Sequence, residues 1–254
     1  MRVGDLALLV VFACALGSPR TAVSKPIHPR FEPDDLELEA PGTIELDVQI
    51  GAIRGATTWR TVAPDLEVDV GILPNLELDL GWTYAFEVPR LHSTPDNLWL
   101  STKVGLFSRH DDNADKLWAL GLQVGPHLPV VAGATRPGWE SLLLIGRMTP
   151  GAQVVLNVGG VIEPQAGAYQ LGLETGFTLD LPLDQRGTFG IGLALASVYF
   201  FSHDPSQLTA TATFNWMAAA TTTLSLTVLA GFTSGSDRFG VLLGVAQKVR
   251  RPRR

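Results

Sequence analysis

The sequence predicts an all-β protein: an antiparallel up-and-down transmembrane β-barrel of about 12 strands, with an N-terminal signal peptide. From residue 43 onward apolar and polar residues alternate, which places the two kinds of side chain on opposite faces of a strand. The alternating segments run about 9–11 residues, the tilted length that crosses the hydrocarbon layer. Their number is even, as in bacterial single-chain barrels.

Composition excludes several other classes of protein. Of the 254 residues, 46% are hydrophobic and 17% are charged, whereas a disordered chain has low hydrophobicity and high charge. The single cysteine has no partner within the chain, which excludes a disulfide scaffold. The net charge of −6 argues against nucleic acid as a partner, because phosphate binding needs a basic surface.

Residues 1–24 are predicted to be a signal peptide. Arg2 precedes an apolar run from Leu6 to Leu16, which is too short for a membrane-spanning helix of about 20 residues but typical of a signal-peptide core. A buried N-terminal helix is the alternative. Two small–x–small sites end at Ala15 and Ser24, and Cys14 is either lipidated or removed with the signal.

The remaining chain divides into three parts. Residues 25–42 hold four prolines and are predicted to form an extended periplasmic leader. Residues 43–248 form the barrel, and residues 249–254 a basic tail; the basic residues from Lys248 onward are either solvated or touch anionic lipid. The expected strands are 44–50, 66–72, 76–86, 97–107, 116–125, 138–147, 152–162, 168–181, 187–200, 207–217, 222–232 and 237–248.

The less apolar face of these strands favours a barrel over a soluble sandwich. It is acidic in the first three strands and then largely Gly, Ala, Ser and Thr, which suit the inside of a closed barrel. Long loops are expected at 54–64, 87–96 and 126–137, and aromatic residues fall toward strand ends, as in the girdles of membrane barrels. A secreted soluble β-sandwich is the alternative.

The segment Leu66-Glu-Val-Asp-Val-Gly-Ile-Leu-Pro-Asn-Leu-Glu-Leu-Asp-Leu-Gly-Trp-Thr-Tyr84 resembles the opening hairpin of outer-membrane transporters associated with the meta-pathway of phenol degradation. The resemblance is sharp only over residues 66–86. It implies a channel for small solutes, hydrophobic or aromatic compounds among them, in the outer membrane of a Gram-negative cell, with outer-membrane lipid and the barrel assembly machinery as partners. Barrels of this kind commonly end on an aromatic residue, whereas this chain ends Arg-Arg-Pro-Arg-Arg254.

An acidic set is the candidate functional site. Its carboxylates occupy the polar phase of their strands and are expected to line the lumen, where the sequence also offers one basic candidate, Lys103. They are either the polar face that any lumen needs or a wall that favours cations, because rings of carboxylates select cations. The acidic candidates are Glu45, Asp47, Glu67, Asp69, Glu77, Asp79, Glu174 and Asp180.

No catalytic motif, cofactor motif or metal-ligand spacing is found, so the protein is not expected to be an enzyme. Gly231-Phe-Thr-Ser-Gly235 has threonine where a nucleophile elbow has serine. The five histidines, His127 among them, are expected to be solvated loop residues. Two functions stay open: an outer-membrane channel or transporter, or a non-transporting structural or binding β-protein, which is either a plugged barrel or a secreted sandwich.

Overall fold

The structure is a computed structural model that describes residues 38–55, 57–88, 93–95, 98–110, 117–129, 136–149, 151–165, 168–201 and 206–250. The expected signal peptide, the leader up to residue 37 and residues 251–254 of the basic tail lie outside the described residues. Among those described, no helix is long and apolar enough to span a membrane.

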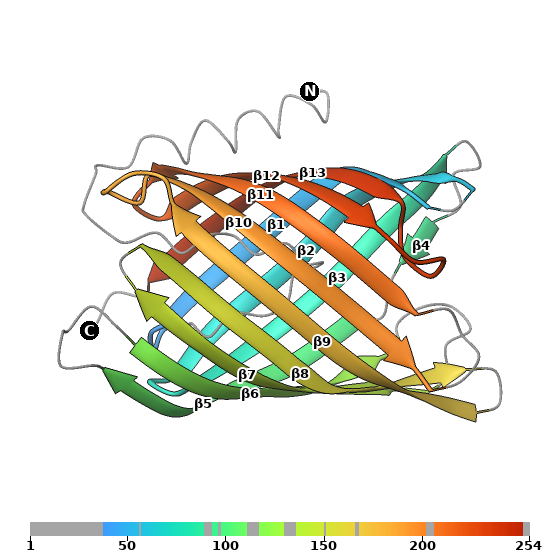
Figure 1. The fold of residues 1–254 in the computed structure, drawn as a ribbon, viewed down its shortest axis with the longest axis horizontal. Helices are drawn as coiled ribbons and strands as arrows, with labels where there is room; N and C mark the ends of the chain where they lie inside the picture. Colours follow the sequence, from blue (N-terminus) through green and yellow to red (C-terminus); the bar gives the residue numbers. More distant parts are fainter. Residues whose placement is uncertain are drawn as a thin grey trace.

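Antiparallel strands close into a barrel, with every strand strongly tilted (Figure 1). The strands are β1 (Thr43–Arg54), β2 (Trp59–Leu73), β3 (Leu76–Val88), β4 (Ser93–Pro95), β5 (Leu98–His110), β6 (Leu117–Leu128), β7 (Gly138–Thr149), β8 (Ala152–Gln165), β9 (Ala168–Pro182), β10 (Phe189–Phe200), β11 (Gln207–Ala219), β12 (Thr222–Gly231) and β13 (Phe239–Arg250).

Pairing of β1 with both β2 and β13 closes the sheet, and β2 pairs with β3. The short β4 and the longer β5 pair with successive parts of β3, at Tyr84–Phe86 and at Leu76–Gly81, so they share one position in the wall. The wall therefore has 12 positions, and the predicted barrel is confirmed. This closure excludes the soluble sandwich that the sequence left open.

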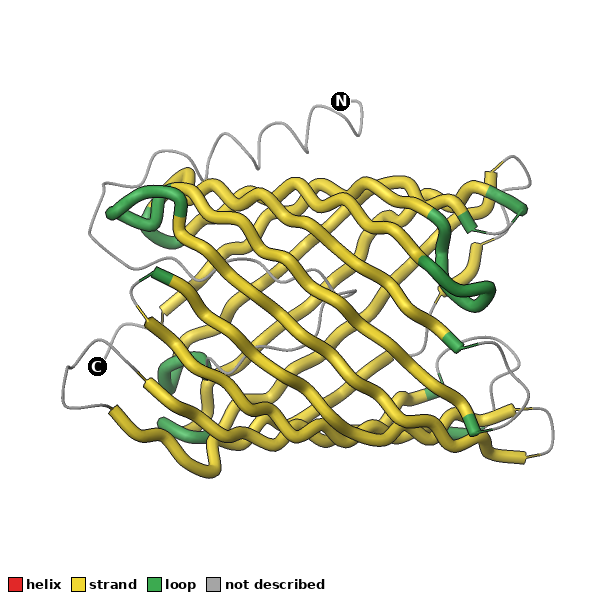
Figure 2. The backbone as a smooth tube through the Cα atoms, viewed as in Figure 1, coloured by secondary structure: helices red, strands yellow, loops and turns green. Residues whose placement is uncertain are grey.

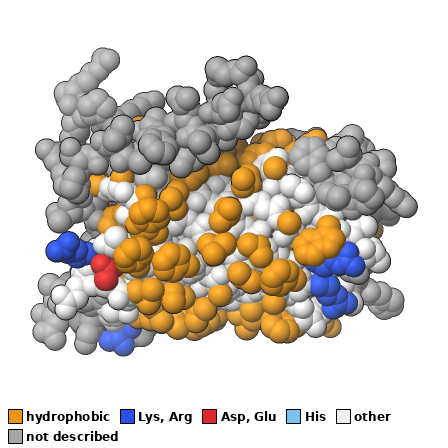
Figure 3. Space-filling model, turned by 90° about the horizontal axis from the view of Figure 1, so that it is seen from above, with side chains coloured by type: hydrophobic (Ala, Val, Ile, Leu, Met, Phe, Trp, Pro, Cys, Tyr) orange, Lys and Arg blue, Asp and Glu red, His pale blue; other side chains and the backbone are white. Residues whose placement is uncertain are grey.

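The two faces of each strand differ as the alternation predicted. In β10, Leu193 and Leu195 are 41% and 43% exposed on the outside, whereas Ala194 between them is 7% exposed and faces the interior. Apolar side chains spread over the middle of the visible outer surface, and lysine and arginine lie toward its two ends (Figure 3). An apolar exterior on a closed barrel is the surface that a membrane protein presents to lipid.

The two ends of the barrel carry different connections (Figure 2). We call the end where β1 starts and β13 finishes the terminal mouth, and the other end the loop mouth. Turns of two residues join β2 to β3, β7 to β8 and β11 to β12 at the terminal mouth, whereas at the loop mouth a connection of this length joins β8 to β9. Short turns are typical of the periplasmic side, which predicts a periplasmic terminal mouth. Exposed aromatic residues lie near both mouths, for example Trp59 and Tyr199 near the loop mouth and Phe189 near the terminal mouth.

Two expected boundaries are wrong. The loop expected at 54–64 is mostly strand, because β2 starts at Trp59. Its register shifts between Val62 and Asp65, at Pro64, which has no N–H to donate to the ladder. The shift lets Val62 and Asp65 both face the interior. At the other end of the chain, β13 continues to Arg250, two residues into the expected tail, because Thr43 of β1 pairs with Arg250.

The closed wall gives a first prediction. The protein should be extracted only by detergent, and it should migrate faster on a gel when unboiled than when boiled, because the hydrogen bonds of a closed barrel hold it compact in dodecyl sulfate. Gel electrophoresis with and without boiling measures this difference. Recovery as a soluble monomer in plain buffer would contradict a membrane barrel.

Candidate functional site in the barrel interior

The acidic residues of the first three strands form one wall of the interior near the terminal mouth. Glu45 and Asp47 of β1, Asp69 of β2, and Glu77 and Asp79 of β3 are all at least nine-tenths buried. Asp69 lies directly opposite Glu45 on one side and Asp79 on the other. Like charges that face each other across strands repel, so this wall needs positive charges nearby. We call these five residues the acidic wall.

Two lysines supply positive charge to the acidic wall. The Nζ atom of Lys103 lies 3.0 Å from Glu77 Oε1. The Nζ atom of Lys248 lies 3.2 Å from Glu45 Oε2 and 2.9 Å from Glu39 Oε1. The expectation that Lys248 is solvated or touches lipid is therefore wrong. The reason is the register of β1 and β13, which sets Lys248 opposite Glu45.

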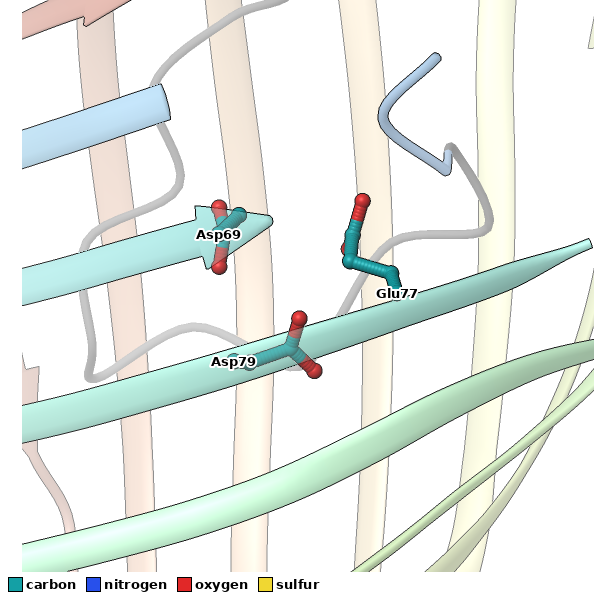
Figure 4. Close-up of side chains that lie close together, drawn as sticks. All are labelled: Asp69, Glu77 and Asp79. Carbon is teal, nitrogen blue, oxygen red and sulfur yellow. The ribbon is translucent and has the colours of Figure 1, made fainter. Parts of the chain in front are cut away.

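Asp69, Glu77 and Asp79 come closest together. One carboxylate oxygen of each lies within 4.8 Å of the others (Figure 4). Asp79 also accepts hydrogen bonds from Ser101 at 2.9 Å and from Gln123 at 3.2 Å. Oxygen atoms of this kind are what a hard cation prefers, and a passing cation would meet them in the interior. The ion pair from Lys103 to Glu77 offsets part of their charge.

Residues 38–42, which precede β1, fold into the terminal mouth; we call them the N-terminal strap. Glu39 is 5% exposed, its backbone N–H donates to the Glu77 carboxylate, and its own carboxylate accepts from Lys248. The strap thus links β3 to β13. Gly71 allows the close approach, because a Cβ there would overlap the backbone of the strap. Residues 38–42 are the described end of the leader predicted for 25–42, and they contact the barrel.

The other predicted acids lie apart from the acidic wall or are less buried. Glu67 is half-buried in β2, opposite Asp47. Glu174 is half-buried and Asp180 is 6% exposed, both in β9, six wall positions away from β2. The predicted acidic set omits two buried acids: Glu39, which lay in the expected leader, and Asp65, which lay between the expected loop 54–64 and the expected strand 66–72. The alternation Leu36-Glu-Leu-Glu39 is the signal that could have revealed Glu39.

His127 is not a solvated loop residue. It lies in β6, and its Nδ1 and Nε2 atoms are 2.6 Å from Glu163 Oε1 and 3.1 Å from Glu140 Oε2. The ring of Trp99 meets the imidazole edge-on, with 6.1 Å between centroids. The prediction failed because β6 extends to Leu128 and turns His127 toward β7 and β8. This cluster lies toward the loop mouth.

Comparison with known proteins extends the description of the fold. No protein-family model matches the sequence, and no curated protein is similar to it in sequence. Among solved structures, an outer-membrane channel from Pseudomonas putida F1 superimposes with a TM-score of 0.60 at 12% identity, over 86% of this chain and all of that one. The NanC porin superimposes with a TM-score of 0.60 at 10% identity, over 80% of this chain and all of that one.

The fold is that of an outer-membrane β-barrel. At such low identity the likeness concerns the fold alone. Together with the closed wall and the apolar exterior, it confirms the expected location in the outer membrane. The resemblance to transporters of phenol degradation stays a prediction.

Proposed function

We propose that the protein is an outer-membrane channel for small solutes whose interior favours cations over anions. The observation that carries the proposal is an imbalance of buried charge. Among the described residues one buried lysine, Lys103, and the half-buried Lys248 face eight buried carboxylates: Glu39, Glu45, Asp47, Asp65, Asp69, Glu77, Asp79 and Asp180.

Such an imbalance acts on permeating ions through the field that it creates. A narrow passage with low-dielectric walls focuses the potential of its charges. Negative potential raises the local concentration of cations and lowers that of anions, as in channels lined by carboxylate rings. The barrel therefore needs no cofactor for selectivity, and the proposal assigns it no catalytic reaction.

The resemblance also implies hydrophobic or aromatic solutes, and one interior feature supports that class. Five apolar side chains from adjacent strands pack together toward the loop mouth, and all are at least nine-tenths buried. They make the interior apolar at this level of the barrel, although at 1–4% exposure their side chains fill the space rather than present a free surface. They are Ile53, Val62, Ala85, Leu229 and Leu242.

A plugged, non-transporting barrel is the second candidate. It is favoured by the N-terminal strap, which at the terminal mouth joins β3 to β13, three wall positions away, through Glu39. Ion conductance of the purified protein in a planar bilayer separates the two candidates. Reproducible single-channel steps support a channel, whereas a membrane that stays silent after insertion supports a plugged barrel.

Selectivity is tested with the triple variant Asp47→Asn, Asp69→Asn and Asp79→Asn. The choice keeps the ion pairs of Lys103 and Lys248 with glutamates. Under a salt gradient the reversal potential of the wild type should have the sign expected for a cation-selective channel. The reversal potential of the variant should lie closer to zero, because three negative charges are lost. The preference should also weaken at high salt, because the Debye length shortens to about 3 Å at 1 M.

Asp184→Asn is the matched control. Asp184 lies in the turn between β9 and β10, where its carboxylate accepts a hydrogen bond from the Phe189 N–H at 3.0 Å. The substitution Asp184→Asn makes the same chemical change outside the acidic wall, so the reversal potential should stay at the wild-type value. An unchanged potential in the triple variant would show that the acidic wall does not control permeation.

A further inference from the structure

A row of neutral polar side chains crosses the interior on the side of β13, β12 and β11. Gln49 of β1 lies opposite Gly244 of β13, which lies opposite Ser225 of β12. Ser225 lies opposite Asn215 of β11, which lies opposite Gly190 of β10. The three polar side chains face the interior and are 3%, 6% and 5% exposed for Gln49, Ser225 and Asn215.

Polar atoms of this row lack hydrogen-bond partners within the described part of the chain. They are Gln49 Oε1, Ser225 Oγ and both amide atoms, Nδ2 and Oδ1, of Asn215. Buried polar groups are nearly always paired, and in the neighbouring row the hydroxyls of Thr213 and Thr227 do pair, at 2.9 Å. The unpaired donors and acceptors therefore point to a partner outside the described part of the chain.

One of the two glycines in the row, Gly190, leaves room for such a partner, whereas the space over Gly244 is filled. A Cβ at Gly244 would overlap Ser225 Oγ and lie 3.1 Å from Gln49 Cγ, so these two side chains lean toward each other over Gly244. Beside Asn215, a Cβ at Gly190 would have one atom within 4 Å, the Leu181 carbonyl oxygen at 3.5 Å. No described side chain therefore lies within 4 Å of a Cβ at Gly190, the residue opposite Asn215.

The chemistry of the row selects the ligand class. An amide presents a donor and an acceptor side by side, and a serine hydroxyl does both. Adjacent hydroxyl groups of a sugar match this pattern, because each hydroxyl also donates and accepts. None of the three side chains carries charge, and Asp65, directly opposite Gln49 on the other side, disfavours an anion. Three strand spacings separate β1 from β11, about 14 Å, which suits one or two sugar rings.

We propose that Gln49, Ser225 and Asn215 bind a neutral polyhydroxyl solute, a sugar or sugar alcohol, within the barrel. The proposal rests on the proposed channel function, which gives such a solute its path to the site. It names a solute class that the acidic wall does not select, because a neutral molecule gains little from the wall's potential. Binding at this row would satisfy the buried amide and hydroxyl groups during passage.

The test is a titration with sorbitol and with glucose, followed by saturation-transfer NMR on the full barrel. The detergent must have a polyoxyethylene headgroup, because a maltoside or glucoside headgroup would compete. Wild type should show saturable binding. Asn215→Leu removes both amide atoms at similar volume and should weaken binding at least about tenfold. Asn157→Leu, the same change at a buried site in β8 outside the row, should bind like wild type.

Absence of saturable binding in wild type, or equal affinity in Asn215→Leu, would overturn the proposal. Heat-dependent migration checks that each variant is folded, and if Asn215→Leu fails that check, Ser225→Ala takes its place with a smaller loss expected. Bilayer conductance is measured separately. A barrel that binds sorbitol but carries no current keeps the site and refutes the channel, whereas a conducting barrel without sorbitol binding refutes the site alone.

Discussion

Replacing Leu195 with arginine is expected to destabilise the barrel by about 2–4 kcal/mol and to reduce the assembled fraction severely. Leu195 lies in the middle of β10 and is 43% exposed on the outer face. Its neighbour on the adjacent strand β9 is Phe177, which is 41% exposed. A guanidinium at this depth would replace an apolar group in hydrocarbon. Urea-induced unfolding in lipid vesicles measures the free energy, and heat-dependent migration measures the assembled fraction.

Two controls separate membrane exposure from general damage. Leu195→Phe keeps the site apolar and should assemble normally. Ala194→Ser puts a hydroxyl on the opposite, inward face, where the register sets it between Thr178 and Thr211, so its cost should be small. A reversed order, with Ala194→Ser severe and Leu195→Arg mild, would mean that the inner and outer faces of β10 are exchanged.

Replacing Gly71 with alanine is expected to expel the N-terminal strap from the terminal mouth. The added Cβ would overlap the carbonyl oxygens of Glu39 and Ala40, and these are backbone atoms that cannot rotate away. Glu39, buried in the wild type, should then become accessible. Limited proteolysis with a glutamate-specific protease measures this, with cleavage after Glu39 detected by the mass of the new N-terminus.

Gly81→Ala is the matched control for the strap. A Cβ at Gly81 would lie 3.7 Å from Trp99 Cε3, which is ordinary contact, so Glu39 should stay protected. If the strap also limits conduction, the single-channel current of Gly71→Ala should exceed that of both wild type and Gly81→Ala. Equal protection of Glu39 in the two variants would show that the strap does not depend on its contact with Gly71.

Much of the wall could be predicted because strand identity is a local property. The segment expected at 168–181 is β9, Ala168–Pro182, and the segment expected at 76–86 starts at the first residue of β3. The face on which each side chain lies follows from the alternation of successive side chains along a strand. Strands with a register shift are exceptions; in β2, the shift at Pro64 lets two residues of opposite parity face inward. A bulge of that kind leaves no mark on the alternation of either half of the strand.

The partners of the acidic residues depended on information that alternation does not carry. Period two tells which face a residue occupies, but not which residue on the next strand lies beside it, because the register is set by pairing over the whole sheet. Lys248 reaches Glu39 across 209 positions of sequence. His127 was misjudged for the same reason, since its partners Glu140 and Glu163 belong to two other strands.

The sequence by itself determined the class of fold, the number of wall positions and the polarity of each face, because these follow from local side-chain periodicity and strand length. Closure was decided only by the tertiary structure. It brings β1 beside β13, seats the N-terminal strap between opposing charges, and aligns Gln49, Ser225 and Asn215 in one row. The physical reason is that the strand tilt and stagger of a barrel are properties of the closed ring as a whole, and no single strand encodes them.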